Sequence, residues 1–60
     1  MDKGNMYQYA ADYFYMAYKA GEDLDKALDY LISIGTEMGV HYFSRLMREY
    51  QFYKEMRGNA

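Results

Sequence analysis

The sequence predicts a small all-α domain, and three observations support this prediction. The chain has no proline and only four β-branched residues, so little in it disfavours helix. Alanine, leucine and methionine, which are strong helix formers, are plentiful. Glycines stand where helices would end, at Gly21, Gly35 and Gly58. We therefore expect a single domain over residues 1–60 with three helices, at about 6–20, 24–34 and 37–57.

The first helix, at about 6–20, follows Asn5, which is an acceptable N-cap. At 100° per residue, its apolar side chains gather on one broad side, with Gln8, Asp12 and Lys19 opposite. The predicted core residues of this helix are Met6, Tyr7, Ala10, Tyr13, Phe14, Ala17 and Ala20.

The second helix, at about 24–34, follows Asp23 as its predicted N-cap. Glu22 and Asp25 add negative charge near the positive end of the helix dipole. Its predicted core residues are Leu24, Ala27, Leu28, Leu31 and Ile32.

The third helix, at about 37–57, is expected to start after Thr36 as its cap. Gly39 leaves an alternative, in which residues 35–39 form a loop and the helix begins near Val40. The side expected to face the core carries Val40, Phe43, Leu46, Met47, Tyr50 and Tyr53.

A second apolar strip runs along the third helix on a different side. It consists of Met38, Tyr42, Phe52 and Met56, interleaved with Arg45 and Glu49. The first helix has a weaker version of the same feature in Tyr9, Met16 and Tyr15. Tyrosine, phenylalanine, methionine and arginine are enriched at protein interfaces. The residues expected to bind a partner are Met38, Tyr42, Arg45, Phe52, Met56, Tyr9 and Tyr15.

The composition favours binding over catalysis. Nine tyrosines, three phenylalanines and six methionines accompany one histidine and no cysteine. A 60-residue domain buries only about 60% of its unfolded surface, and this one has neither disulfides nor thiolate metal ligands to stabilise it. We therefore expect a homodimer or higher oligomer.

Catalytic and cofactor motifs are not recognisable in the sequence. Glu37 and His41 stand four residues apart on the predicted third helix, but neither Ser33 nor Ser44 belongs to a nucleophile motif. The spacings typical of zinc, haem and di-iron ligands are missing. We expect no enzyme activity, no cofactor, no metal and no small-molecule substrate.

Nucleic-acid binding is the alternative hypothesis, because the charge is unevenly distributed. Residues 1–40 contain three Lys against seven Asp or Glu, a net charge of −4, whereas residues 41–60 have a net charge of +2. The candidate contacts to phosphates or bases are Arg45, Arg48, Lys54 and Arg57, which lie among aromatic residues. On this hypothesis the protein is a small helical regulator of transcription or RNA.

The main hypothesis is a non-enzymatic regulator or inhibitor that docks its aromatic and methionine-rich helical surface onto another protein. A chain this small suits a phage or mobile-element accessory factor. The start of the sequence lacks the layout of a signal peptide, and no apolar run approaches the ~18 residues that span a membrane. We therefore expect the protein in the cytoplasm, without membrane contact.

Overall fold

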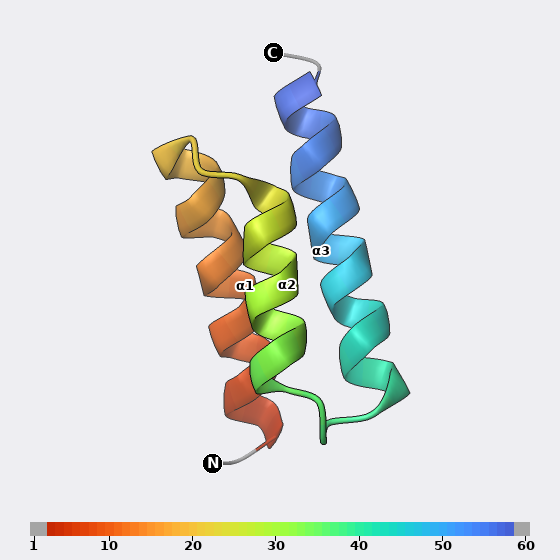
Figure 1. The fold of residues 1–60 in the computed structure, drawn as a ribbon. Helices are drawn as coiled ribbons and strands as arrows, with labels where there is room; N and C mark the ends of the chain where they lie inside the picture. The colour runs from red at the N-terminus through yellow and green to blue at the C-terminus, as the bar shows by residue number, and fades with distance from the viewer. Residues whose placement is uncertain (1–2, 59–60) are drawn as a thin grey trace.

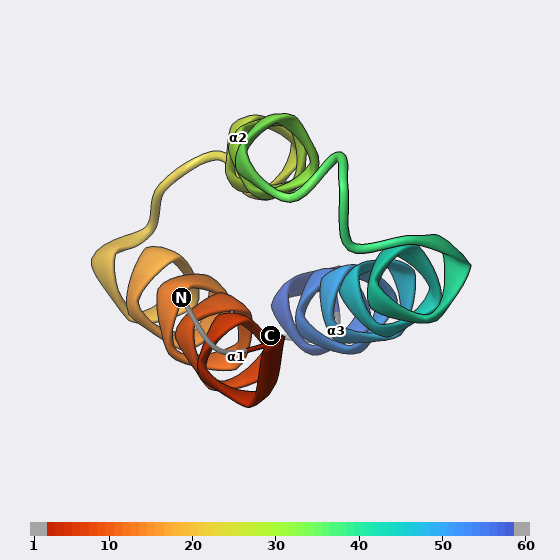
Figure 2. The ribbon, with the colours of Figure 1, turned by 90° about the horizontal axis from the view of Figure 1, so that it is seen from below.

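The computed structural model describes residues 3–58, which contain three helices and no strand. The helices are α1 (Lys3–Ala20), α2 (Leu24–Ile34) and α3 (Val40–Gly58). α2 runs opposite to α1 and α3 (Figure 1). Seen along their axes, the helices stand at the corners of a triangle (Figure 2). The all-α, three-helix prediction is therefore confirmed; residues 1–2 and 59–60 of the predicted domain lie outside the described residues.

Two aromatic pairs set the register between α1 and α3. Near the starts of these helices, the rings of Tyr7 and Tyr42 meet edge to face, with their centroids 5.8 Å apart. Near their ends, the rings of Tyr18 and Tyr53 lie 5.2 Å apart. The two helices therefore run parallel, and aromatic contacts join them at both ends.

The boundaries of α2 follow the local sequence. The Asp23 carboxylate accepts a hydrogen bond from the backbone N–H of Asp25 at 2.9 Å, so the predicted N-cap is confirmed. Gly21 directly follows α1, and Gly35 is the C-cap of α2. The prediction for Asn5 is wrong, because α1 begins at Lys3 and contains Asn5.

The third helix begins later than expected. Gly39 has φ +94°, a left-handed conformation that cannot continue an α-helix. The predicted start at residue 37 with Thr36 as its cap is therefore wrong, and the alternative start at Val40 is the one observed. The amide of Met38 donates to the carbonyl of Gly35 at 3.0 Å, which closes a turn within this loop.

The predicted core is largely confirmed for the first two helices. Met6, Ala10, Phe14 and Ala17 of α1 are buried, whereas Ala20 is exposed. In α2 the buried residues are Leu24, Ala27 and Leu31, with Leu28 and Ile32 half-buried beside them.

The start of α3 is rotated relative to the prediction. Val40 and Phe43, both expected in the core, are 69% and 47% exposed. Tyr42, expected on the outer side, is buried with Leu46 in the core. Farther along, Tyr50 and Tyr53 pack against the core as predicted. The two strips have similar apolar content, so hydrophobic periodicity alone could not identify the buried one.

Tyr42 touches all three helices through specific contacts. Its hydroxyl donates to the carbonyl of Leu31 near the end of α2, at 2.9 Å. That carbonyl belongs to the last turn of α2, where the helix itself supplies no donor. The ring also lies against Gly35, where an added Cβ would approach the Tyr42 Cζ to 2.7 Å. Gly35 is therefore the residue that makes room for the aromatic ring.

Gly35→Ala should destabilise the protein by about 1–3 kcal/mol, because the new methyl group overlaps a buried aromatic ring. Urea unfolding followed by circular dichroism measures this change. Gly58→Ala is the matched control, since a Cβ there meets no atom within 4 Å, and it should cost no stability. Equal stability of the two variants would contradict the packing described for Tyr42.

Alkaline pH should weaken the fold through Tyr42. Burial raises the pKa of its phenol above the ordinary value of about 10. Below pH ~10 both the folded and the unfolded chain keep this proton, and the stability is complete. Above pH ~10 the unfolded chain loses the proton first, so the free energy of unfolding should fall as pH rises toward the folded pKa. Tyr42→Phe should make this fall less steep in urea titrations between pH 8 and pH 11; an unchanged slope would contradict it.

Candidate functional site

Several exposed apolar and aromatic side chains of α1 and α3 lie toward the ends of these helices. Phe52 and Met56, one turn apart on α3, are 52% and 41% exposed, and Tyr15 of α1 is 50% exposed. The Phe52 ring meets that of Tyr53 at 5.0 Å, and Tyr53 in turn meets Tyr18 of α1. We name this surface the aromatic face; its residues are Tyr15, Tyr18, Phe52, Tyr53 and Met56.

Tyr53 is the central side chain of the aromatic face. Burial raises the pKa of its phenol, and the neighbouring Glu49 carboxylate raises it further. Tyr15 lies three residues before Tyr18, on the same side of α1, and the Lys19 ammonium lies 5.9 Å from the centre of its ring. The aromatic face is therefore built by two parallel helices, with Tyr53 holding its partly buried centre.

Four of the seven predicted partner-binding residues lie elsewhere, and one of them, Arg45, lines a separate hollow with Tyr7 and Arg48. Tyr42 is in the core, so the expectation that it faces outward is wrong. Met38 packs half-buried against the core from the loop before α3. Tyr9 lies between α1 and α2, where its hydroxyl is 3.3 Å from that of Tyr30. Phe52, Met56 and Tyr15 are the predicted residues that the structure brings together.

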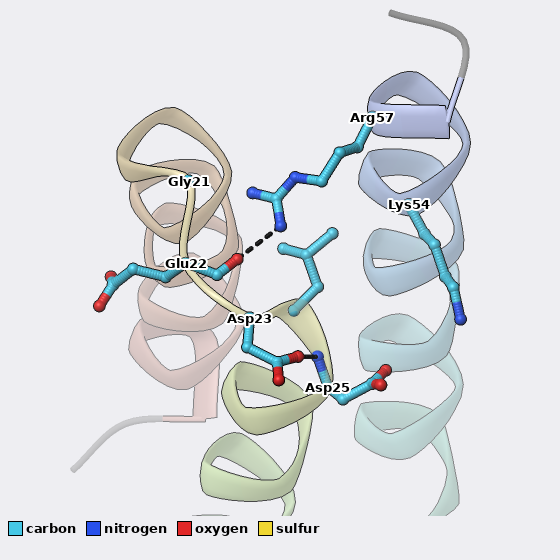
Figure 3. Close-up of a pocket in the computed structure, with 7 residues that line it drawn as sticks. Gly21, Glu22, Asp23, Asp25, Lys54 and Arg57 are labelled. Atoms are coloured by element: carbon cyan, nitrogen blue, oxygen red, sulfur yellow. Dashed lines mark hydrogen bonds between the residues drawn. The ribbon is translucent and has the colours of Figure 1, made fainter.

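Arg57, a predicted nucleic-acid contact, joins α3 to the end of α1. Its Nη2 donates to the carbonyls of Ala17 and Tyr18, at 3.3 and 3.1 Å, and its Nη1 donates to the carbonyl of Glu22. The guanidinium also lies 5.6 Å from the centre of the Tyr18 ring. Figure 3 shows Arg57 reaching across from α3 to Glu22. A cation is favourable here, because the carbonyls of Ala17 and Tyr18 belong to the last turn of α1, the negative end of its dipole.

Lys54, also a predicted nucleic-acid contact, is exposed and takes part in a chain of hydrogen bonds that leads to α2. Its Nζ donates to the Tyr50 hydroxyl at 2.9 Å, and that hydroxyl donates to the Asp25 carboxylate. The hydrogen bond to Tyr50, aided by the charge of Asp25, raises the pKa of the Lys54 ammonium. A pocket of about 400 Å³ lies between Lys54, Arg57 and the α1–α2 turn (Figure 3). Arg57 therefore joins α3 to the end of α1, and the Tyr50 hydroxyl that Lys54 contacts joins α3 to α2.

Arg45 and Arg48 are exposed and lie in a different environment. They line an open hollow of about 300 Å³ at the starts of α1 and α3, which we name the basic hollow. Its lining residues are Tyr7, His41, Ser44, Arg45 and Arg48. Sequence reasoning assigned no binding role to Tyr7, His41 or Ser44. The sequence spacing could have indicated a shared site, because positions 41, 44, 45 and 48 lie on one face of a helix.

The rotation of α3 also leaves an apolar groove between α2 and α3. It has a volume of about 300 Å³ and lies near Gly35 and Gly39. The large side chains that line it are Ile32, Val40, Tyr42, Phe43 and Leu46. Val40 and Phe43 are therefore exposed at the edge of a groove instead of filling the core.

The Glu37–His41 pair does not have the geometry expected for it. Glu37 lies in the loop before α3, so the two residues do not share a helical face. Within residues 3–58, no three His, Asp or Glu side chains are grouped as a metal site would require. None of the helices in that range is long and apolar enough to cross a membrane.

Comparisons of this chain with protein-family models, curated proteins and solved structures found no match. The aromatic face, the basic hollow and the apolar groove are the surfaces of the described residues from which a function can be inferred.

Arg57→Ala should lower the free energy of unfolding by about 1–2 kcal/mol, because it removes charged hydrogen bonds to three carbonyls. Arg57→Lys should restore only part of the loss, since an ammonium lacks the planar fork of a guanidinium. Urea unfolding measures both variants.

Arg48→Ala is the matched control for Arg57, because Arg48 is an exposed arginine of the same helix. It should change the free energy of unfolding by less than about 0.5 kcal/mol. Equal losses from Arg57→Ala and Arg48→Ala would show that the contacts with α1 contribute nothing specific.

Proposed function

We propose that this protein is a small non-enzymatic regulator or inhibitor that binds another protein through its aromatic face. The observation that supports this most directly is the exposure of Phe52, Met56 and Tyr15 on adjacent helices. The core is filled by other residues, so these three side chains are not needed to complete it. Their residue types are those enriched at the centres of protein interfaces.

The energetics favour a contact at this face. Complete burial of one large apolar side chain stabilises by roughly 1.5–3 kcal/mol. Small domains have little stability of their own, so covering two or three such side chains is a large gain for this chain. A second copy is the simplest partner, because one self-complementary face can be used by both copies.

Nucleic-acid binding receives less support from the arrangement of the cations. Lys54 and Arg57 are hydrogen-bonded to Tyr50 and to the end of α1, on the side of the molecule that faces α2 and the α1–α2 turn. Arg45 and Arg48 line the basic hollow in the first half of α3. The four cations thus form two separate pairs instead of the single strip that follows a phosphate backbone.

Phe52→Ala and Met56→Ala should weaken self-association while leaving helicity unchanged, because both side chains are half-exposed. Light scattering after size-exclusion chromatography, at about 10–200 µM protein, measures the mass of each variant. Val40→Ala is the matched control, since it removes a more exposed apolar side chain beside the apolar groove. Dissociation by Val40→Ala but not by Phe52→Ala would move the contact to that groove.

If the wild-type chain is a monomer throughout this range, the partner is a different protein. The same three variants then serve as paired baits in affinity capture from the native cell, followed by mass spectrometry. We expect a partner that is retained by wild type and by Val40→Ala and lost from Phe52→Ala. Equal capture by all the baits would refute the aromatic face as the binding surface.

A further inference from the structure

The basic hollow has the composition of an anion site. Four of its five residues, His41, Ser44, Arg45 and Arg48, come from one face of α3, and Tyr7 comes from α1. All five side chains carry hydrogen-bond donors. None of the lining residues is a carboxylate, although the chain as a whole is acidic. The hollow is therefore a local concentration of donors and positive charge on a negatively charged protein.

The fold holds two helices of this site in fixed positions. The ring of Tyr7 packs edge to face against the buried ring of Tyr42. Tyr42 is itself held by its hydrogen bond to the carbonyl of Leu31. The rotation of α3 that buries Tyr42 also turns Arg45 and Arg48 outward beside Tyr7. A ligand would thus meet a site whose helices are already in place.

The donor set fits one class of anion better than others. Two guanidinium groups carry two positive charges and present planar forks that match phosphate oxygens. A terminal phosphate carries about −1.5 to −2 charges at neutral pH and exposes three acceptor oxygens. A carboxylate has two oxygens and one charge, and a phosphodiester has one charge. The hydroxyls of Ser44 and Tyr7 and the imidazole of His41 give the hollow more donors than those smaller anions use.

We propose that the basic hollow binds a terminal phosphate group, a phosphomonoester, through Arg45 and Arg48 with Ser44, His41 and Tyr7 as additional donors. The phosphomonoester is either a small free molecule or a phosphorylated side chain of a protein. This proposal does not depend on the aromatic face, because the site needs no partner protein to form.

Titration of the ¹⁵N-labelled full chain with phenyl phosphate, followed by NMR, tests the proposal. Amide shifts should concentrate at residues 41–48 and at Tyr7, and titration to about 10 mM detects millimolar dissociation constants. Phenyl sulfate at the same ionic strength is the matched probe, since it has a similar shape and one charge. Equal binding of both compounds, or shifts spread evenly over the protein, would overturn the proposal.

Variants separate specific recognition from general attraction of anions. Arg45→Ala and Arg48→Ala should each weaken phenyl phosphate binding by at least about tenfold, and Arg48→Lys should recover only part of the loss. Lys26→Ala removes an exposed cation of α2 and is the control, which should bind as wild type does. Circular dichroism of each variant verifies that the helices are intact. Unchanged affinity in folded Arg45→Ala and Arg48→Ala variants would overturn the assignment.

Two further probes identify the source of the phosphate. A phosphoserine peptide that binds more tightly than phenyl phosphate indicates a phosphorylated protein, and equal affinity indicates a free phosphomonoester. A single-stranded oligonucleotide without terminal phosphates tests the phosphodiester backbone. If the oligonucleotide binds through the same residues more tightly than phenyl phosphate and the phosphoserine peptide do, the site binds nucleic acid and the proposal is wrong.

Discussion

The burial of Tyr42 is the constraint on which the rest of the structure depends. Its ring occupies the space left by Gly35, packs against Tyr7 and sends its hydroxyl to the last turn of α2. A buried phenol needs a hydrogen-bond partner, and the carbonyl of Leu31 is one that its own helix leaves free. The same contact fixes the rotation of α3 about its axis. Every other residue of that helix takes its inward or outward position accordingly.

At the opposite end of the bundle, polar contacts add to the aromatic contact between Tyr18 and Tyr53. Arg57 covers the final carbonyls of α1, while Tyr50 connects Lys54 on α3 to Asp25 on α2. A domain this small has few side chains for a second apolar layer, so long residues that pack their stems and bond through their ends are effective there. This use of cations for structure leaves Arg45 and Arg48 as the pair that lines an open hollow.

Two chemically distinct surfaces therefore share the α1–α3 side of the molecule. The aromatic face lies toward the ends of these helices, beside the Tyr18–Tyr53 contact, and the basic hollow lies toward their starts, beside the Tyr7–Tyr42 contact. Both surfaces depend on α1 and α3 running parallel, because each combines residues from both helices. The protein-binding function and the phosphate site that we propose are thus built on one rigid pair of helices.

The sequence by itself determined the helical class, the turn between α1 and α2 and most of the core faces of these two helices, because these follow from local propensity, glycine positions and one dominant apolar stripe. It also singled out Phe52, Met56 and Tyr15, which the structure leaves exposed together. Only the tertiary structure decided which strip of α3 is buried and which cationic side chains form hydrogen bonds within the protein. Two strips of similar hydrophobicity are equivalent on an isolated helix. The difference between them comes from a hydroxyl partner on α2 and from carbonyls at the end of α1, contacts between residues far apart in the chain.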